Sequence, residues 1–351
     1  MLEQRVREDL KATGKEAKFL RNIWYVAGYS RELDENNRLT RRLLGEAIFI
    51  FRTDDGRLCA LRNRCPHRFA PLSMGRLEGD AVRCAYHGLA FDGSGSCRHN
   101  SHGPKGALSV RAYPIVEQDG LLWIWMGTPD QADRATIPDF GKLDPQQFHV
   151  RSGYLHGQAP YELMSDNILD LSHIEFLHPL LGTPEVSQAK VEVRQEEGQV
   201  IVRRHMRGEV LPAGLAQVYR TGARAVDRML EVVWHPPASM VLTVSVATSD
   251  GGPDWQSGSQ TLHIFTPETS GTTHYFYVAS LARDKAGDEA ADGFFAALEL
   301  VFTTEDKPMI DAQAAEIGEE EFEDLRPALL PIDKGPVLAR CRLKQMIEAE
   351  C

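Results

Sequence analysis

The stretches Cys65-Pro-His-Arg-Phe-Ala-Pro-Leu-Ser73 and Cys84-Ala-Tyr-His-Gly-Leu-Ala-Phe-Asp-Gly-Ser-Gly95 each place a thiol and an imidazole on one loop. The spacings are Cys-x-His and Cys-x2-His, and sixteen residues, 68 to 83, lie between the two motifs. Two cysteines and two histidines make a set of four ligands. Such a set suits a structural zinc ion, or a two-iron cluster with cysteines on one iron and histidines on the other. The residues by themselves leave both possibilities open.

Short strands are predicted around these loops. The apolar runs Ala47-Ile-Phe-Ile-Phe51 and Gly120-Leu-Leu-Trp-Ile-Trp-Met-Gly127 are typical of strands, and Asp55-Gly56 predicts a hairpin turn. Because every predicted element of this region is a strand, we expect an all-β domain over residues 20–135.

The rest of the chain predicts a second domain of mixed structure. A polar segment with prolines at both ends, residues 128–138, is typical of a linker. Beyond it, helical patterns occur together with alternating strands, for example around the Glu197-Gly198 turn. We therefore expect an α+β protein: an arm at 1–19, then the all-β domain, and then a domain at 136–351 with an antiparallel sheet flanked by helices.

Length, composition and charge exclude several classes of function. A chain of 351 residues with 42% hydrophobic and 25% charged residues is typical of a soluble globular protein. The net charge of −11 argues against nucleic acid as a partner. No apolar run reaches the length of a membrane span, and the charged N-terminus lacks the apolar core of a secretion signal, so we expect a cytoplasmic protein.

A second group of candidate metal ligands lies in the stretch Asn167-Ile-Leu-Asp-Leu-Ser-His-Ile-Glu-Phe-Leu-His178. This stretch predicts a helix over about 161–178, in which His173 and His178 stand about 140° apart and diverge. Pro179 disfavours helical geometry at His178, so the helix is expected to end there and turn the second imidazole back. The pair then binds a metal ion, or is a buried helix end with hydrogen-bonded histidines. Asp170 precedes His173 by three residues and is expected to accept a hydrogen bond from an imidazole N–H.

Taken together, these motifs resemble the oxygenase components of the Rieske non-heme iron oxygenases, and among them the vanillate and dicamba demethylase group. The resemblance implies a Rieske [2Fe–2S] domain in which Cys65 and Cys84 bind one iron and His67 and His87 the other. It also implies a helix-grip-like catalytic domain with a mononuclear Fe(II), for which His173 and His178 supply two ligands, and it places Asn167 beside them.

The resemblance requires a carboxylate as the third iron ligand. The helical pattern from Asp292 to about Ile317 places Phe295, Leu298, Phe302 and Met309 on one apolar stripe, with Asp306 within about 40° of Phe302. An acid inside such a stripe needs a partner, so Asp306 is the predicted ligand and Glu305 the alternative. Pro308 breaks or kinks a helix, and Asp306 as the cap of a helix beginning near that proline is therefore a further interpretation.

By the same resemblance, Asp170 bridges His87 of one subunit to His173 of its neighbour, which implies a ring, usually a homotrimer. An Asp170 that only accepts a hydrogen bond within its own subunit is the alternative. The expected partners are O2, a small aromatic substrate, and a separate reductase or ferredoxin, because this chain has no nucleotide-binding Gly-x-Gly-x2-Gly motif and NAD(P)H acts only indirectly.

The implied reaction is O- or N-demethylation of the aromatic substrate. Two alternatives are ring dihydroxylation to a cis-diol and a Rieske electron-transfer protein without catalysis. In the family, the strands that follow Met229 form the wall of the substrate pocket, and here they carry His235 and His263. The resemblance therefore implies that these imidazoles hydrogen-bond the substrate, and histidines at the surface or satisfied within the core are the alternative. Leu169 and Ile174 are assigned as apolar lining.

Overall fold

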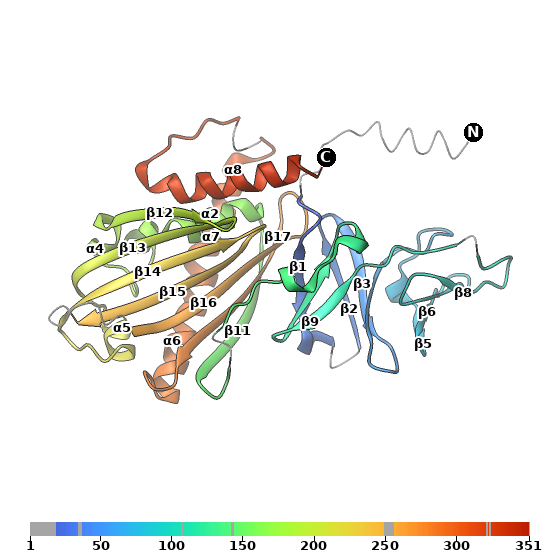
Figure 1. Ribbon diagram of the computed structural model, residues 1–351, viewed down its shortest axis with the longest axis horizontal. Helices are drawn as coiled ribbons and strands as arrows, with labels where there is room; N and C mark the ends of the chain where they lie inside the picture. Colours follow the sequence, from blue (N-terminus) through green and yellow to red (C-terminus); the bar gives the residue numbers. More distant parts are fainter. Residues whose placement is uncertain are drawn as a thin grey trace.

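The computed structural model describes residues 19–33, 37–106, 108–141, 144–248, 256–320, 322 and 324–350. The predicted arm lies outside the described residues up to position 18. Small sheets occupy one end of the molecule and a large sheet with its helices occupies the other (Figure 1). No helix within the described ranges is long and apolar enough to cross a membrane.

The N-terminal part consists of three small antiparallel sheets with strand orders β1-β10-β9, β2-β3-β4 and β5-β6-β7-β8, as predicted. The predicted Asp55-Gly56 turn joins β3 to β4, with Gly56 at a φ of +82°. The strands are β1 (Trp24–Tyr29), β2 (Arg38–Leu43), β3 (Glu46–Arg52), β4 (Leu58–Arg62), β5 (Arg76–Glu78), β6 (Ala81–Arg83), β7 (Ala90–Asp92), β8 (Cys97–His99), β9 (Ile115–Gln118) and β10 (Leu121–Trp125).

The C-terminal part is built on a seven-stranded antiparallel sheet of order β11-β17-β16-β15-β14-β13-β12. Glu197-Gly198 forms the predicted turn between its first hairpin strands, with both residues at positive φ. The strands are β11 (Phe148–Gly157), β12 (Lys190–Glu196), β13 (Gln199–Val210), β14 (Ala225–His235), β15 (Ser239–Thr248), β16 (Gln256–Pro267) and β17 (Thr273–Ala282).

The two faces of this sheet have different partners. One face packs against helices through residues such as Trp234 and Tyr275, and these residues form the main core. The other face presents Leu262 and Phe276 to Trp123 of β10, which buries the junction with the small sheets. Successive strand residues point to opposite faces, so the helix-facing residues are the ones that can reach a site beneath the helices.

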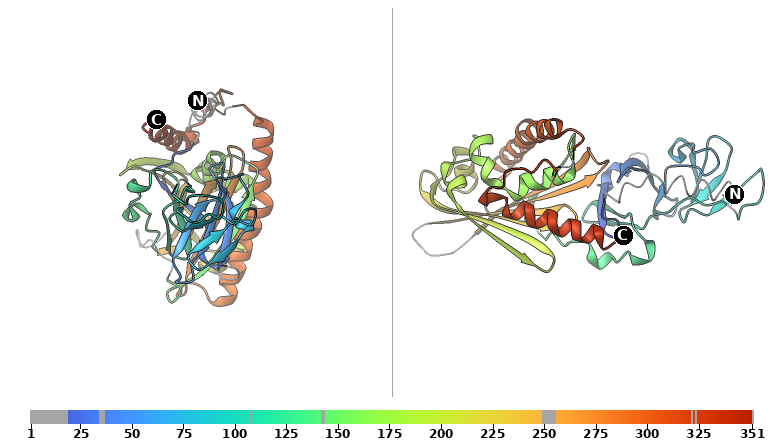
Figure 2. Two further views of the ribbon diagram at one scale, coloured as in Figure 1. Left: turned by 90° about the vertical axis from the view of Figure 1, so that its right-hand side faces the viewer. Right: turned by 90° about the horizontal axis from the view of Figure 1, so that it is seen from above.

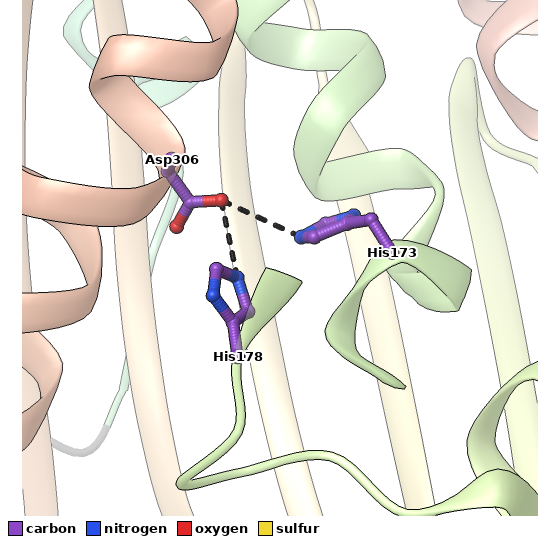
Figure 3. A group of neighbouring side chains, drawn as sticks. All are labelled: His173, His178 and Asp306. Atoms are coloured by element: carbon purple, nitrogen blue, oxygen red, sulfur yellow. Dashed lines mark ion pairs between the residues drawn. The ribbon is translucent and has the colours of Figure 1, made fainter. Parts of the chain in front are cut away.

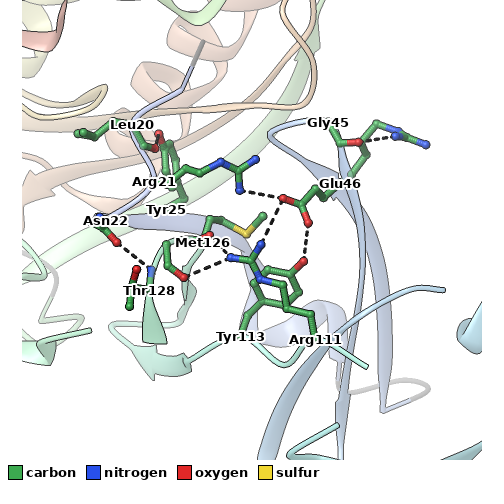
Figure 4. Close-up of polar contacts among 12 residues, drawn as sticks. Leu20, Arg21, Asn22, Tyr25, Gly45, Glu46, Arg111, Tyr113, Met126 and Thr128 are labelled. Carbon is green, nitrogen blue, oxygen red and sulfur yellow. Dashed lines mark hydrogen bonds and ion pairs between the residues drawn. The ribbon is translucent and has the colours of Figure 1, made fainter. Parts of the chain in front are cut away.

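Polar contacts hold the segment before β1, both within the N-terminal part and to the C-terminal end of the chain. The Glu46 carboxylate accepts from Arg21 Nη1 at 2.8 Å and from Tyr113 OH at 2.6 Å (Figure 4). Burial raises the pKa of Glu46, but these hydrogen bonds outweigh burial and lower it below its usual value. Glu350, just past the last helix, accepts from the main-chain N–H groups of Arg21 and Asn22.

The helix predicted over about 161–178 is interrupted earlier than expected. Helix α2 covers Tyr161–Leu169, and the next residue, Asp170, adopts an extended conformation with φ −117° and ψ 99°. Its carboxylate accepts from the N–H of Ser172 and caps the 3₁₀ turn that follows. Because a short polar side chain competes with the helix for backbone donors, a break falls at Asp170, which the sequence did not predict. The expected end before Pro179 is also present, since helix α3 (Ile174–Leu177) is followed by His178, which has φ −118° and ψ 80°.

The helical region before and after Asp306 is continuous, and Pro308 does not break it (Figure 2). A π-helical turn, η6 (Phe302–Asp306), joins α6 (Asp288–Val301) to α7 (Lys307–Ile317). The extra residue of a π turn rotates all that follows. Met309 was therefore wrongly placed on the apolar stripe: it is exposed, and Ile310 is buried instead.

The remaining helical segments are shorter or peripheral. They are α2 (Tyr161–Leu169), η5 (Leu171–His173), α3 (Ile174–Leu177), α4 (Pro184–Gln188), α5 (Ala213–Val218) and α8 (Lys334–Glu348), with 3₁₀ turns η1 (Ser30–Leu33), η2 (Leu72–Met74), η3 (Pro129–Gln131), η4 (Arg134–Thr136) and η7 (Pro331–Asp333).

Candidate active site

Three of the predicted ligands meet between η5, the end of α3 and the π turn. Asp306 Oδ1 lies 3.5 Å from His173 Nε2 and 3.2 Å from His178 Nε2 (Figure 3). One ligand atom from each residue can be chosen so that all three lie within 4.8 Å of one another. His178 and Asp306 are buried, and His173 is partly exposed. A straight α-helix would turn two imidazoles five residues apart away from each other. Here His173 ends a 3₁₀ turn and His178 lies just past the end of α3 with φ −118° and ψ 80°, and both imidazoles face one point.

The far side of each imidazole is already occupied. His173 Nδ1 lies 2.7 Å from the main-chain oxygen of Asp170, and His178 Nδ1 lies 2.7 Å from a carboxylate oxygen of Glu305. A carbonyl or carboxylate oxygen only accepts, so both Nδ1 atoms carry the proton and both Nε2 atoms are left with a lone pair. Each ring is therefore oriented and held in the tautomer that binds a metal through Nε2.

Three acceptors thus converge on one point, which is unfavourable unless a cation or a proton lies among them. Burial by itself lowers the pKa of His178, but the carboxylates of Asp306 and Glu305 outweigh burial and raise it. In the absence of a metal, a proton on an imidazole fills this role: burial raises the pKa of Asp306, yet hydrogen bonds from His173 and His178 lower it well below its usual range. Two imidazoles and a carboxylate are the donor set typical of non-heme Fe(II), so these residues fit a mononuclear iron.

Two further predicted residues lie beside this group. Asn167 Nδ2 donates to Asp306 Oδ1 at 3.2 Å. The Asp170 carboxylate accepts from Ser172 and from Arg204 Nη2 at 3.1 Å, so it is the main-chain oxygen of Asp170, and not its carboxylate, that accepts from His173. Arg204 was missed from the sequence.

The two cysteine loops are near copies of each other. The N–H of Cys65 donates to Ala70 O and that of Cys84 to Leu89 O, so each cysteine pairs with the fifth residue after it. The fourth residue, Phe69 in one loop and Gly88 in the other, donates back to the cysteine carbonyl and adopts positive φ in both loops. The two loops therefore present their cysteine side chains in equivalent settings.

The side chains of these loops suit a cluster. Both thiols are buried, and burial raises the pKa of Cys65 to about 11, with the Cys84 thiol contributing. The imidazoles of His67 and His87 lie at 4.4 Å between ring centroids. His87 Nδ1 is buried without a hydrogen-bond partner, which is costly for a polar atom unless a ligand binds it. These features fit a two-iron cluster.

A cavity of about 80 Å³ lies next to His173, His178 and Asp306. Its wall is mainly apolar, and the polar part includes His263, whose Nδ1 contacts Tyr275 OH at 2.7 Å while Nε2 has no partner. The other lining residues are Ile168, Leu171, Ile174, Leu181, Leu215, Tyr219, Arg228, Leu230, Leu242, Val244, Ser259, Thr261, Phe294, Leu298, Val301 and Phe302.

Two of the four residues predicted to contact substrate lie in this wall, His263 and Ile174, and two do not. His235 points to the opposite face of β14, because residues 226 to 234 alternate and the even positions are the buried ones. Leu169 is fully buried in the core, and the preceding Ile168 lines the cavity instead.

Arg228 is a lining residue that the sequence reasoning missed. The signal was present, since Arg228 is a charged residue in the buried register of an otherwise apolar alternation on β14. Such a residue requires a partner, which Glu209 of β13 provides.

Comparison with known proteins accounts for both halves of the chain. Residues 157–349 match the family described as Vanillate O-demethylase oxygenase C-terminal domain, and residues 23–114 match the Rieske [2Fe-2S] domain. The latter match favours an iron–sulfur cluster over zinc at the cysteine loops.

Relatives span nearly the whole chain. The oxygenase component of dicamba O-demethylase from Stenotrophomonas maltophilia is 35% identical, over 95% of this chain and 99% of that protein. The oxygenase component of chloroacetanilide N-alkylformylase from Rhizorhabdus wittichii is 35% identical, over 95% and 97%.

A solved structure of dicamba monooxygenase bound to 3,6-dichlorosalicylic acid superimposes with a TM-score of 0.86 at 34% identity, covering 95% of this chain and 98% of that one. Another is described as containing non-heme iron and dicamba, with a TM-score of 0.79 at 34% identity, covering 95% and 99%. By these matches, this chain is an oxygenase component and belongs to the Rieske non-heme iron oxygenases of the vanillate and dicamba O-demethylase group.

Proposed function

We propose that this oxygenase removes a methyl or other alkyl group from an oxygen or nitrogen atom of a small aromatic compound. His173, His178 and Asp306 would hold the mononuclear Fe(II), and Cys65, His67, Cys84 and His87 the [2Fe–2S] cluster. The observation that carries this proposal is the meeting of two imidazole lone pairs and a carboxylate at the wall of an apolar cavity.

An iron ion at this site would offer open positions to dioxygen and, with electrons from the cluster, supply the oxidant for a C–H bond of the alkyl group. A methoxy group, O2, two electrons and two protons give a phenol, formaldehyde and water. The hydroxylated methyl group then loses formaldehyde without further oxidation. A separate reductase or ferredoxin delivers the electrons and draws on NAD(P)H.

The chain's own residues prepare this step. Asp170 O and Glu305 fix the two imidazoles, and Asn167 donates to Asp306 Oδ1, which restrains the carboxylate. The apolar wall excludes water and holds the aromatic ring so that its alkyl group faces the ligand set. The proposed division into a Rieske domain over 20–135 and a catalytic domain over 136–351 separates electron entry from this pocket.

We also propose that the chain works as a homotrimeric ring, with Asp170 of one subunit near His87 of the next. The β5–β8 sheet with the cysteine loops lies at one end of the molecule, and other sheets separate it from the iron site (Figure 1). Phe69 and Tyr86 are exposed beside the cluster ligands, and Phe176 and Leu180 beside His178. Two exposed apolar patches, one at each metal region, favour docking of one subunit's cluster against its neighbour's iron site. A cytoplasmic location accords with electrons drawn from NAD(P)H.

Metal content tests the assignment first. Anaerobically purified protein is expected to contain about three irons and two acid-labile sulfides per chain, the content of one Rieske cluster and one mononuclear iron. Zinc without sulfide would contradict both ligand sets.

A single-turnover assay then tests the reaction, with dithionite-reduced protein mixed with oxygen and methoxylated or N-methylated aromatics. Formation of formaldehyde in an amount equal to that of the phenol or amine supports demethylation. A cis-diol that retains both oxygen atoms would show ring dihydroxylation instead.

A further inference from the structure

The charge of the cavity wall bears on which aromatic compounds enter. Apart from the iron ligands, the described lining residues include one charged side chain, Arg228. The remaining polar groups are uncharged: Tyr219 OH pairs with Ser259 Oγ at 3.0 Å, and burial lowers the pKa of His263 to about 3, so its imidazole is neutral. An anionic substrate would therefore depend on Arg228 for a counter-charge in the wall.

Arg228 already has its counter-charge. Its Nε and Nη2 donate to the two carboxylate oxygens of Glu209 at 2.9 and 2.6 Å, a two-pronged pair. Its third nitrogen, Nη1, lies 3.3 Å from the main-chain oxygen of Leu181. Arg228 is 2% exposed and Glu209 is 0% exposed, so water does not screen the pair.

We propose that Glu209 is a specificity-determining residue that cancels the charge of Arg228, so that the cavity accepts uncharged aromatic substrates such as amides and ethers and rejects carboxylates. This inference rests on the proposed demethylation. A benzoate would lose its hydration in an apolar pocket whose one arginine is held by a competing carboxylate. A neutral amide or ether loses less on entry, and the free Nε2 of His263 can serve it as a hydrogen-bond partner.

Matched pairs of probes test the proposal. The 2-, 3- and 4-methoxybenzamides and the corresponding methoxybenzoates have nearly the same shape and differ in charge. Calorimetry on the holoprotein measures affinity, and the single-turnover assay measures formaldehyde. We expect at least one benzamide to bind about tenfold or more tightly than its benzoate. Equal or tighter binding of the benzoates would overturn the inference, and so would failure of all six compounds to bind.

The two readouts separate this inference from the proposed function. Tight binding of the benzamides without formaldehyde or phenol would contradict demethylation while supporting the charge preference. Formaldehyde from the benzoates at equal or higher rate would support demethylation and overturn the charge preference.

Variants locate the cause. Glu209→Gln leaves the charge of Arg228 uncompensated and is expected to reduce or reverse the preference for the benzamides. Thr183→Val is the matched control. The Thr183 hydroxyl is uncharged and donates to Glu209 Oε1, the oxygen that also accepts from Arg228 Nη2. The preference should survive it.

Loss of a buried partner can unfold the protein, so a second variant is needed. Glu209→Leu combined with Arg228→Met removes both charges and is expected to keep the preference for the neutral probes. A double variant that binds the benzoates as well as the benzamides would show that the pair does not set the selectivity.

Discussion

The two metal-binding regions of this protein are assembled in opposite ways. The cluster loops lie within residues 65–89, repeat one hydrogen-bond pattern, and leave His67 exposed and His87 partly exposed. The iron site joins His173 and His178 to a carboxylate more than a hundred residues later, and side-chain and main-chain groups orient each imidazole. A site made by loop geometry depends on backbone conformation, whereas a site made by tertiary contacts depends on buried partners.

The largest effect should come from Asp306→Ala. Removal of the carboxylate leaves two neutral imidazoles, too few ligands for Fe(II), and should abolish turnover and mononuclear iron. The red-brown Rieske absorption should remain, because the cysteine loops do not contact Asp306. Metal analysis and the visible spectrum check this. Retained activity would remove Asp306 from the site.

Next in size is Arg204→Met, which leaves the Asp170 carboxylate without its buried partner. Breaking such a pair costs about 3 kcal/mol of unfolding free energy, measured by urea denaturation. Arg203→Met is the control, because Arg203 pairs with Glu231 at a more exposed position and should cost about 1 kcal/mol or less. Equal losses for the two variants would contradict the buried role of Arg204.

Glu305→Gln should weaken iron binding without removing it. Glutamine can still accept from His178 Nδ1, but it lacks the negative charge that makes the imidazole a better ligand, and the loss of affinity should be about tenfold to a hundredfold. Competition with a chelator measures it. Glu299→Gln, an exposed residue of the same helical region, should leave the affinity unchanged.

The smallest effect should come from Gly88→Ala in the second cysteine loop. Gly88 has a φ of +72° and no neighbour that would meet a Cβ atom, so the cost is conformational, about 1 kcal/mol. Thermal unfolding of the cluster-containing protein checks this, with Gly106→Ala as a control that has no positive φ. Phe69 occupies the equivalent position of the first loop and also has a positive φ, so Phe69→Gly should remove conformational strain from the loop backbone where Gly88→Ala adds it. An unchanged unfolding temperature for Gly88→Ala would contradict a need for positive φ at this position.

Local patterns determined much of this protein. The loops at Cys65 and Cys84, the hairpin turns at Asp55-Gly56 and Glu197-Gly198, and the candidate ligands His173, His178 and Asp306 could all be chosen from residue type and spacing. This is possible because turn geometry and strand alternation follow from a few neighbouring residues.

Tertiary packing set two features of this protein: which face of a helix or strand each side chain occupies, and which residue pairs with each buried charge. The π turn before Lys307 rotates the side chains that follow it, so Met309 was assigned to the wrong face. Leu169 was misplaced because the sequence does not show which side of α2 meets the cavity, and the structure turns Ile168 to it. His235 was misplaced because its strand register was unknown. The pairs Asp170 with Arg204 and Glu209 with Arg228 join residues 34 and 19 positions apart. The hydrophobic periodicity of a segment predicts that a charged residue on its buried face needs a partner. Only the packing of strands and helices selects the residue that becomes this partner.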